Sequence, residues 1–278
     1  MSQGTSPTKI VLSLLTWNTR DISMESVAAL AQEAAWLQQQ GCAAFLVVCD
    51  NGSTDGTADA LRAADAALEI PHRFLWNESN RGISVAGNQM LDVFQQVEGD
   101  FLLMMDGDIE IVPYSSLAMM RHLETSDHQL GCLGAHMKYH TRLREETAVA
   151  LHNVSDYPVT DDRQTLWVAW TQYGLFRREV FEAGVRFDES GPFAGPGWGC
   201  EDVDLAFQMH SRGFYLQSFA GMVYLHRNLN SSIPSLQQQG VDAHTMFRAR
   251  RDYVIKKWEG RNLGQETLDF LRRSEPQF

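Results

Sequence analysis

The chain has 278 residues, of which 44% are hydrophobic and 21% charged, a composition typical of a globular protein with one large domain or two small ones. Asp and Glu number 35 against 23 Lys and Arg, which gives a formal net charge of −12. This excess of negative charge disfavours broad binding to nucleic acids or anionic membranes, although a single basic pocket could still hold a small phosphorylated ligand.

The first 130 residues predict strands that alternate with helices. Each apolar run rich in β-forming residues ends in a polar turn, and the first three turns lead into a helical pattern. The predicted strands are 9–16, 44–49, 73–76 and 101–105, and the predicted helices are 24–40, 58–68 and 83–96. Such units predict an α/β sheet with right-handed crossovers, in which ligands bind beyond the carboxyl ends of the strands.

The pattern becomes less regular after about residue 131. The predicted elements are strands at 133–139, 167–176 and 216–225, helices at 177–183 and 201–212, an irregular or hairpin segment at 141–162, and a Gly/Pro/aromatic loop at 190–199. The polar stretch 227–240 could order when a ligand binds. No linker-like composition separates the two parts, so we predict one domain over residues 9–260 with halves at 9–130 and 131–260, followed by a tail at 261–278.

The N-terminal residues 1–8 are polar and contain no signal-peptide core, and no apolar run approaches the roughly 18 residues that cross a bilayer. We therefore expect a cytoplasmic protein with a disordered N-terminus and no transmembrane segment. The cysteines are Cys42, Cys49, Cys132 and Cys200, and none of them has the close spacing of a zinc knuckle or a redox pair. Reduced, mostly buried thiols are expected.

The most specific motif is Asp106-Gly-Asp108, directly after a buried apolar strand. The glycine lets the chain turn so that both carboxylates can face one point, where they could hold a hard divalent cation that bridges the oxygens of a diphosphate. His226 follows the last predicted strand and could supply a third ligand. Taken singly, an Asp-Gly-Asp can be a solvated turn and a histidine can be a packed or surface residue, but their shared position at strand ends favours a metal site.

Two further motifs carry polar groups at the predicted sheet edge. Asp50 opens the segment DNGSTDGT, and its carboxylate could accept hydrogen bonds from a uracil or guanine N–H or from ribose hydroxyls. A capped turn between strand and helix explains the rest of that segment equally well. In GWGCEDVD, at 197–204, Trp198 offers a flat face to a sugar ring, Glu201 could orient an acceptor and Asp202 could act as a base. Acidic residues in a first helical turn can also simply offset the helix dipole.

Several familiar signatures are missing from the sequence. There is no Gly-x-Gly-x-x-Gly after the first strand, no Gly-Lys-Ser/Thr phosphate loop and no Gly-x-Ser-x-Gly elbow, which argues against dinucleotide-binding, P-loop and simple serine hydrolase classes. The basic residues Arg248, Arg250, Arg251, Lys256 and Lys257 are predicted to form a solvated helix face, from which one arginine could reach a diphosphate.

Together, the ordered motifs resemble the family 2 glycosyltransferases of the GT-A fold. The resemblance covers about residues 9–260 and rests on Thr-Trp-Asn at 16–18, DNGSTDGT at 50–57, Asn-Arg-Gly-Ile-Ser at 80–84, DGD at 106–108, GWGCEDVD at 197–204 and His226. The Gly-Trp-Gly-x-Glu-Asp block is also similar to that of the β-1,4-galactosyltransferases and the polypeptide N-acetylgalactosaminyltransferases. The resemblance implies a mostly parallel sheet flanked by helices, with a nucleotide-sugar-binding half at 9–130 and an acceptor-binding half at 131–260.

The resemblance also implies a role for each matching residue. Thr16, Asn18 and Asp50 would contact the nucleoside, Arg81 and Gly82 would line the donor pocket, Asp106 would touch ribose or metal, Asp108 and His226 would ligate Mn²⁺ or Mg²⁺, and Trp198 and Glu201 would meet the acceptor. Asp202 would be the base in a single displacement with inversion. The first turn reads Thr-Trp-Asn-Thr where Tyr-Asn is more usual, so the nucleoside contact at Trp17 stays open.

The hypothesis is therefore a metal-dependent enzyme that moves a sugar from a nucleotide diphosphate sugar, UDP being preferred, to an acceptor hydroxyl. A sugar-1-phosphate nucleotidyltransferase is one alternative, but it would carry a glycine-rich loop after the first strand, and residues 16–21 contain no glycine. A haloacid-type phosphatase would place its Asp pair after the first strand rather than the fourth. A non-catalytic protein that binds sugar nucleotides is the other alternative, and the complete set of acidic motifs disfavours it.

Overall fold

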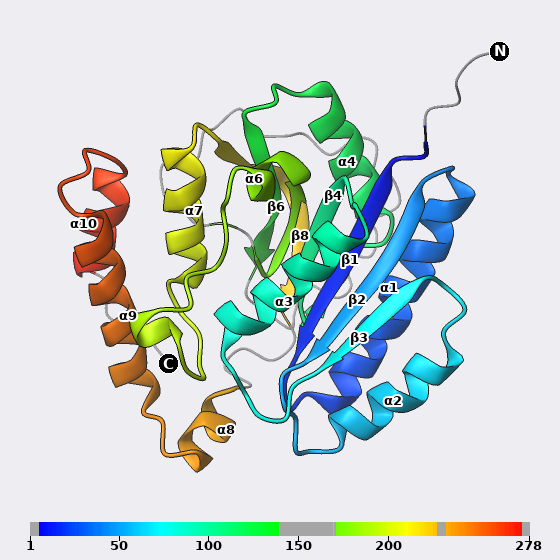
Figure 1. Cartoon of the computed structure of the whole chain (residues 1–278), viewed down its shortest axis with the longest axis horizontal. Coiled ribbons are helices and arrows are strands. Elements are labelled where there is room, and N and C mark those ends of the chain that lie inside the picture. Colours follow the sequence, from blue (N-terminus) through cyan, green and yellow to red (C-terminus); the bar gives the residue numbers. More distant parts are fainter. Residues whose placement is uncertain (1–5, 139–168, 170, 227–231, 274–278) are drawn as a thin grey trace.

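The computed structural model describes residues 6–138, 169, 171–226 and 232–273, with backbone only for 135–138, 218–226 and 232 (Figure 1). Its elements are β1 (Lys9–Thr16), α1 (Arg20–Gln39), β2 (Ala43–Asp50), α2 (Thr57–Ala67), β3 (His72–Trp76), α3 (Ile83–Gln96), β4 (Phe101–Asp106), β5 (Ile109–Glu110), α4 (Ser115–Thr125), β6 (Leu130–Lys138), β7 (Tyr173–Arg177), α6 (Arg178–Glu182), a 3₁₀ turn (Gly191–Phe193), α7 (Glu201–Ser211), β8 (Tyr215–His226), α8 (Ser232–Gln238), α9 (Ala243–Trp258) and α10 (Gln265–Arg273).

The described strands form one sheet in the order β3-β2-β1-β4-β7-β6-β8-β5. β1 is parallel to both β2 and β4, and β2 is parallel to β3, as the alternating strands and helices predict. β7 runs antiparallel to β4 and β6, while β6 and β8 are again parallel. The predicted α/β architecture with a mostly parallel sheet is confirmed.

Helices cover both faces of this sheet, and the strand residues alternate between the two layers. Ile10, Leu12 and Leu14 of β1 are fully buried in a cluster with residues of α1, α2 and α4, whereas Val11 joins a second cluster with α3, α6 and α7. Figure 1 shows α3 on the opposite side of the sheet from α1 and α2. A strand buried on both faces is largely apolar, which accounts for the near-continuous apolar runs.

A third cluster joins α7, α9 and α10 beside the sheet. Its buried residues are Phe193, Cys200, Val203, Phe207, Val254, Trp258, Leu268 and Leu271. The stretch expected to be a tail at 261–278 therefore contains a packed helix, because Leu268 and Leu271 lie one turn apart on the buried face of α10. The sequence expectation missed this short amphipathic pattern.

Other differences from the sequence expectations are local. Thr8 is tied to the sheet through its carbonyl, which accepts a hydrogen bond from the Ala43 N–H at 2.9 Å, so order begins before residue 9. The strand predicted at 167–176 is observed only as β7, and the segment predicted at 141–162 lies outside the described residues. In the polar stretch 227–240, residues 232–238 form α8. None of the cysteines, all of which lie in described positions, forms a disulfide.

The turn after β4 is held by buried polar groups of α1. The Ser26 hydroxyl donates to the carbonyls of Gly107 and Ile109, both at 3.2 Å. The Glu33 carboxylate accepts from the Tyr114 N–H at 2.7 Å and from the Ser116 N–H and hydroxyl at the start of α4. Burial raises the pKa of Glu33, and these three donors lower it. The two α1 side chains thus anchor both ends of the segment that follows Asp106.

Replacing Glu33 by alanine should leave the Tyr114 and Ser116 N–H groups buried without an acceptor. We expect Glu33→Ala to lower the free energy of unfolding by about 2 to 4 kcal/mol, measured by urea denaturation. The neighbouring Gln32→Ala, at an exposed position of the same helix, is the control and should change stability by less than about 0.5 kcal/mol. Equal effects of the two substitutions would contradict this role for Glu33.

Candidate active site

Three of the motifs lie side by side at the carboxyl edge of the sheet. β1 ends at Thr16, β2 at Asp50 and β4 at Asp106. In the register of the sheet, Thr16 lies opposite Asp50, and Leu15 lies opposite Asp106. Because the three strands are parallel, their ends share one edge, as the sequence predicted.

Acidic residues from distant segments gather at this edge. The pKa of Asp106 is raised well above its ordinary value, first by burial and then by the negative charges of Asp108, Glu201 and Asp202. Asp106 ends β4 and Asp108 lies in the turn after it, while Glu201 and Asp202 begin α7. Folding therefore brings the DGD and Glu-Asp motifs together across almost a hundred residues of sequence.

His226 lies at the same edge as Asp108. β5 pairs antiparallel with β8, and Ile109, the residue after Asp108, lies opposite His226. Positions 108 and 226 are thus near one another in the backbone, although the His226 side chain is outside the described set. Among the described side chains, no three His, Cys, Asp or Glu groups are arranged around one metal-sized position. Metal ligation by His226 therefore stays a prediction.

The acidic residues at the start of α7 have separate environments. Asp202 Oδ1 accepts a hydrogen bond from the Val203 N–H at 2.8 Å. Burial and the neighbouring Glu201 raise the pKa of Asp202 to about 7. Asp204 is turned away from this group and accepts from the Trp258 indole N–H at 2.7 Å and from Lys257 at 2.8 Å. Asp204 thus holds α9 against α7, and Asp202 stays at the sheet edge.

Glu201 faces a buried arginine. Arg250 is 1% exposed, and its Nη1 lies 3.6 Å from Glu201 Oε2. The same guanidinium donates to the carbonyls of Gly195 and Pro196 at 3.1 and 3.3 Å. Burial raises the pKa of Glu201, and the charge of Arg250 lowers it. Arg250 thereby connects the Gly/Pro/aromatic loop at 190–199, called the Gly/Pro loop below, to the acidic cluster.

The prediction that the basic residues of 248–257 form a solvated face is wrong for Arg250 and Lys257. Arg250 is fully buried, and Lys257 bridges Asp188, at 2.7 Å, and Asp204. The sequence did contain a signal, since Arg250 lies in helical register with the buried Ala243, Val254 and Trp258. The sequence interpretation gave more weight to the charge of Arg250 than to this helical periodicity.

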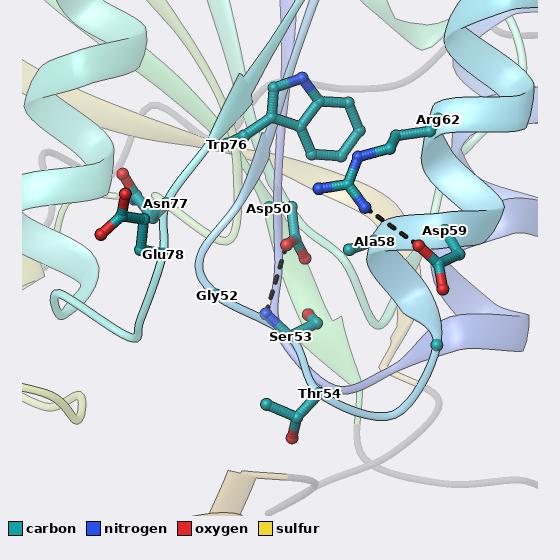
Figure 2. Close-up of a pocket in the computed structure, with 11 residues that line it drawn as sticks. Asp50, Gly52, Ser53, Thr54, Ala58, Asp59, Arg62, Trp76, Asn77 and Glu78 are labelled. Atoms are coloured by element: carbon teal, nitrogen blue, oxygen red, sulfur yellow. Dashed lines mark hydrogen bonds and ion pairs between the residues drawn. The ribbon is translucent and has the colours of Figure 1, made fainter.

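A pocket of about 370 Å³ opens beside Asp50 (Figure 2). Its lining residues are Asp50, Gly52, Ser53, Thr54, Gly56, Ala58, Asp59, Arg62, Trp76, Asn77 and Glu78. Asp50 is 2% exposed, and its Oδ2 accepts from the Ser53 N–H at 3.2 Å. Its Oδ1 is buried and has no hydrogen-bond partner in the described part of the chain. A buried carboxylate oxygen without a donor is costly, so a ligand with a donor group suits this position.

Asn51, which the sequence reading left in a plain turn, joins the β2–α2 loop to the turn at 80–82. Its side-chain oxygen accepts from the Arg81 N–H at 3.1 Å, and its amide donates to Asn80 Oδ1 at 3.1 Å and to the Gly82 carbonyl at 3.3 Å. Gly82 has φ +85°, and a Cβ there would come within 2.2 Å of the Gly195 carbonyl oxygen. Gly82 therefore has to be glycine, and it packs the turn at 80–82 against Gly195 of the 190–199 loop.

The other predicted contact residues lie around the same edge. Thr16 is 1% exposed, and its hydroxyl is 3.5 Å from the Cys49 carbonyl. Asn18 accepts from the Thr54 N–H at 2.8 Å and donates to the Ser235 hydroxyl at 3.3 Å, so it connects the β2–α2 loop with α8. Trp198 is half-buried, with its ring 6.4 Å from that of Phe247 on α9. Asn18 and Trp198 thus also have structural contacts beside their predicted roles.

The sequence matches the model of the family described as Glycosyl transferase family 2 over residues 34–185. A comparison with curated proteins finds no match. None of the helices in the described ranges is both long and apolar enough to cross a membrane.

Several solved structures share the fold at low sequence identity. The mannosyltransferase PcManGT from Pyrobaculum calidifontis, in complex with GDP-Man and Mn²⁺, is 16% identical with a TM-score of 0.62, and the match covers 91% of this chain and 65% of that one. S. aureus TarS 1-349 in complex with UDP-GlcNAc is 14% identical with a TM-score of 0.59, and the match covers 95% of this chain and 72% of that one. Glucosyl-3-phosphoglycerate synthase from Mycobacterium tuberculosis, in complex with Mn²⁺, UDP and glucosyl-3-phosphoglycerate, is 17% identical with a TM-score of 0.53. This match covers 87% of this chain and 78% of that one. The chain spans less than two thirds of the mannosyltransferase, and the shared feature is the predicted fold.

The raised pKa of Asp202 makes stability depend on pH. Between its ordinary value of 3.8 and about 7, the folded carboxyl holds a proton that the unfolded chain has released, so rising pH favours unfolding. Asp202→Asn removes this contribution. In urea denaturation with EDTA, the variant should therefore gain stability relative to the wild type as the pH rises from about 4 to about 7, with a constant difference above that range. Asp59→Asn, at a side chain 88% exposed, is the control, and its difference in stability from the wild type should not change over this pH range. A difference in stability between Asp202→Asn and the wild type that does not change with pH would contradict the raised pKa.

Proposed function

The chain belongs to glycosyl transferase family 2, and from this premise we propose that it moves a sugar from a nucleoside diphosphate sugar to a hydroxyl group of an acceptor. The observation that carries the proposal is the meeting of the DGD and Glu-Asp motifs at the carboxyl edge of the sheet, beside a pocket that contains an unpartnered Asp50 oxygen. A nucleotide sugar would fit these two environments, because its base can donate an N–H to Asp50 and its diphosphate can bind a cation held by the carboxylates.

The nucleoside would occupy the side of the edge formed by β1 and β2. Asp50 Oδ1 would accept from a ring N–H of the base, and Thr16 and Asn18 would contact the nucleoside from the end of β1. Arg81 and Gly82, held by Asn51, would line the donor pocket. UDP is the proposed nucleotide: the structures with the same fold include complexes with UDP-GlcNAc and with UDP, and another holds GDP-Man.

The acidic cluster fits a divalent cation. Asp106 and Asp108 offer the hard oxygen ligands that Mn²⁺ and Mg²⁺ accept, and the charges of Glu201 and Asp202 lie close enough to act on Asp106. Asp106, Asp108 and His226 would hold the ion. When bound, it would offset the negative charge that develops on the departing diphosphate. Several structures with the same fold contain Mn²⁺.

Asp202 would act as the general base. It would take the proton of the acceptor hydroxyl while that oxygen bonds to the anomeric carbon, and the bond from this carbon to the diphosphate oxygen would break with inversion. A carboxylate with a pKa of about 7 is well matched to this task near neutral pH. Trp198 and Glu201 would meet the acceptor, and Arg250 would keep Glu201 and the Gly/Pro loop in place.

Removing the Asp108 carboxylate should remove metal-dependent donor binding. In thermal-shift measurements on the wild type with UDP, GDP, TDP and CMP sugars, we expect the largest stabilisation with a UDP-sugar, and only with Mn²⁺ or Mg²⁺ present. We also expect the wild type to hydrolyse UDP-sugar slowly when no acceptor is present. Asp108→Ala should abolish both this hydrolysis and the cation-dependent stabilisation by UDP-sugar. Asp127→Ala, on an exposed turn, is the control. Unchanged turnover of Asp108→Ala with added Mn²⁺ would exclude the metal from the mechanism.

The role of Asp202 is tested by separating turnover from binding. Asp202→Asn should lower turnover by about 10²- to 10⁴-fold while UDP binding in the presence of Mn²⁺ is retained, because the base acts only on the acceptor. Asp252→Asn, at a side chain 64% exposed, should leave turnover unchanged. An active Asp202→Asn enzyme would place the base elsewhere, and retention of the anomeric configuration in the product would rule out the single displacement.

A further inference from the structure

A second cavity lies between α7, α9 and the loop at 183–190 that follows α6. Its volume is about 570 Å³, within the range of small-molecule sites. Figure 1 shows α7 and α9 side by side. Arg212, at one wall, follows the last turn of α7, about 16 Å along the helix from Glu201. None of the described residues that line this cavity belongs to the acidic edge or to the sequence motifs.

The lining of this cavity is basic, although the chain as a whole is acidic. Among the described residues it contains four cationic side chains and one carboxylate, namely Arg186, Arg212, Lys257, Arg261 and Asp188. In the whole chain, by contrast, 35 acidic residues outnumber 23 Lys and Arg. The cavity therefore reverses the general charge of the protein, and it suits an anion.

Two of the four cations are already paired with carboxylates. Lys257 bridges Asp188, at 2.7 Å, and Asp204, at 2.8 Å. Arg186 Nη2 lies 2.6 Å from Asp92 Oδ1. These ion pairs fix α9 and the 183–190 loop against the rest of the domain. They leave the net positive charge of the cavity to the other two arginines.

Arg212 and Arg261 have no carboxylate partner in the described part of the chain. Arg212 is held by backbone carbonyls, since its Nε donates to Ala183 at 2.8 Å and its Nη1 donates to Gln208 at 3.1 Å. The guanidinium carbon of Arg261 lies 4.8 Å from the centre of the Trp258 ring, and its N–H groups bond no described residue. Carbonyls and an aromatic ring orient a guanidinium without cancelling its charge. Both arginines therefore present a full positive charge at the cavity.

We propose that this cavity binds the phosphate monoester of a small polar molecule through Arg212 and Arg261. A phosphate group has three strong acceptor oxygens in a tetrahedral arrangement, so it can accept from guanidinium groups that come from two different elements. A carboxylate accepts within one plane and matches a single guanidinium better. The cavity is larger than one phosphate group, which leaves room for the rest of the ester.

A small soluble ester is the source of phosphate that the charge of the protein favours. The net charge of −12 opposes the approach of an anionic membrane or a nucleic acid, whereas a small ester has to meet only the local field of the cavity. The inference does not rest on the proposed function, because the cavity shares no described lining residue with the acidic edge.

The test measures the binding of glucose 6-phosphate to the full chain by calorimetry, in buffer without divalent cations or nucleotides. The wild type should bind one molecule with a Kd of about 1 mM or tighter, and added salt should weaken binding because the contact is between charges. Arg212→Gln and Arg261→Gln should each weaken binding by about tenfold, since each removes charge-assisted hydrogen bonds. The matched control is Arg73→Gln, at an exposed position of β3 outside the cavity, which should change the Kd by less than about twofold.

Three comparison ligands define the class that is bound. Glucose should not bind, and glucuronic acid, which carries a carboxylate instead of the phosphate, should bind at least about fivefold more weakly than the phosphate ester. Vesicles that contain phosphatidylglycerol should not bind. Equal affinity for glucuronic acid would overturn the assignment to phosphate, and vesicle binding that requires the two arginines, without binding of the ester, would assign the cavity to a lipid surface.

The variants decide whether the cavity is the site. Absence of saturable binding to the wild type would overturn the inference, as would unchanged binding by both cavity variants or equal weakening by Arg73→Gln. Thermal unfolding without ligand shows whether each variant is folded. If Arg212→Gln loses stability because its carbonyl contacts are gone, Arg261→Gln still decides the result, since its guanidinium bonds no described residue.

Discussion

The crowding of partly buried carboxylates is the constraint on which the candidate site depends. Asp106 lies among Asp108, Glu201 and Asp202, and its pKa is raised by burial and by their charges. Such a group is unfavourable unless protons, a cation or buried donors compensate it. Among the described side chains, Arg250 brings a guanidinium to this group, with its Nη1 3.6 Å from Glu201 Oε2. A site of this kind suits a ligand or ion that brings positive charge.

Much of the surrounding structure holds these acidic groups in position. From α1, Ser26 bonds the two carbonyls that flank Asp108, and Glu33 caps the start of α4 beyond it. From α9, Arg250 holds Glu201 and the Gly/Pro loop, while Lys257 joins Asp188 to Asp204. The acidic edge is therefore supported by polar contacts from α1 and from α9, most of which satisfy buried or partly buried groups.

Close packing of loops connects the Asp50 side of the sheet edge with the acidic side. Asn51 joins the β2–α2 loop to the turn at 80–82, and Gly82 lies so close to Gly195 that no larger residue fits. Gly195 in turn accepts a hydrogen bond from Arg250, which faces Glu201. Contacts therefore connect Asn51, through Gly82, Gly195 and Arg250, to Glu201 at the start of α7. A nucleotide bound beside Asp50 would rest against loops that also hold the proposed base.

The sequence by itself determined the α/β class, the parallel strands and the edge at which Thr16, Asp50 and Asp106 end, because apolar runs and turn residues are local properties with a fixed period. It also predicted the acidic motifs as candidates, since residue type and position after a strand are visible without coordinates. Only the tertiary structure decided which charges meet. Arg250 and Lys257 look like solvent-exposed residues until α9 packs on α7, Asn51 looks like an ordinary turn residue, and Arg212 belongs to no motif at all. Burial and pairing arise from contacts between segments far apart in the chain, and no local pattern encodes those distances.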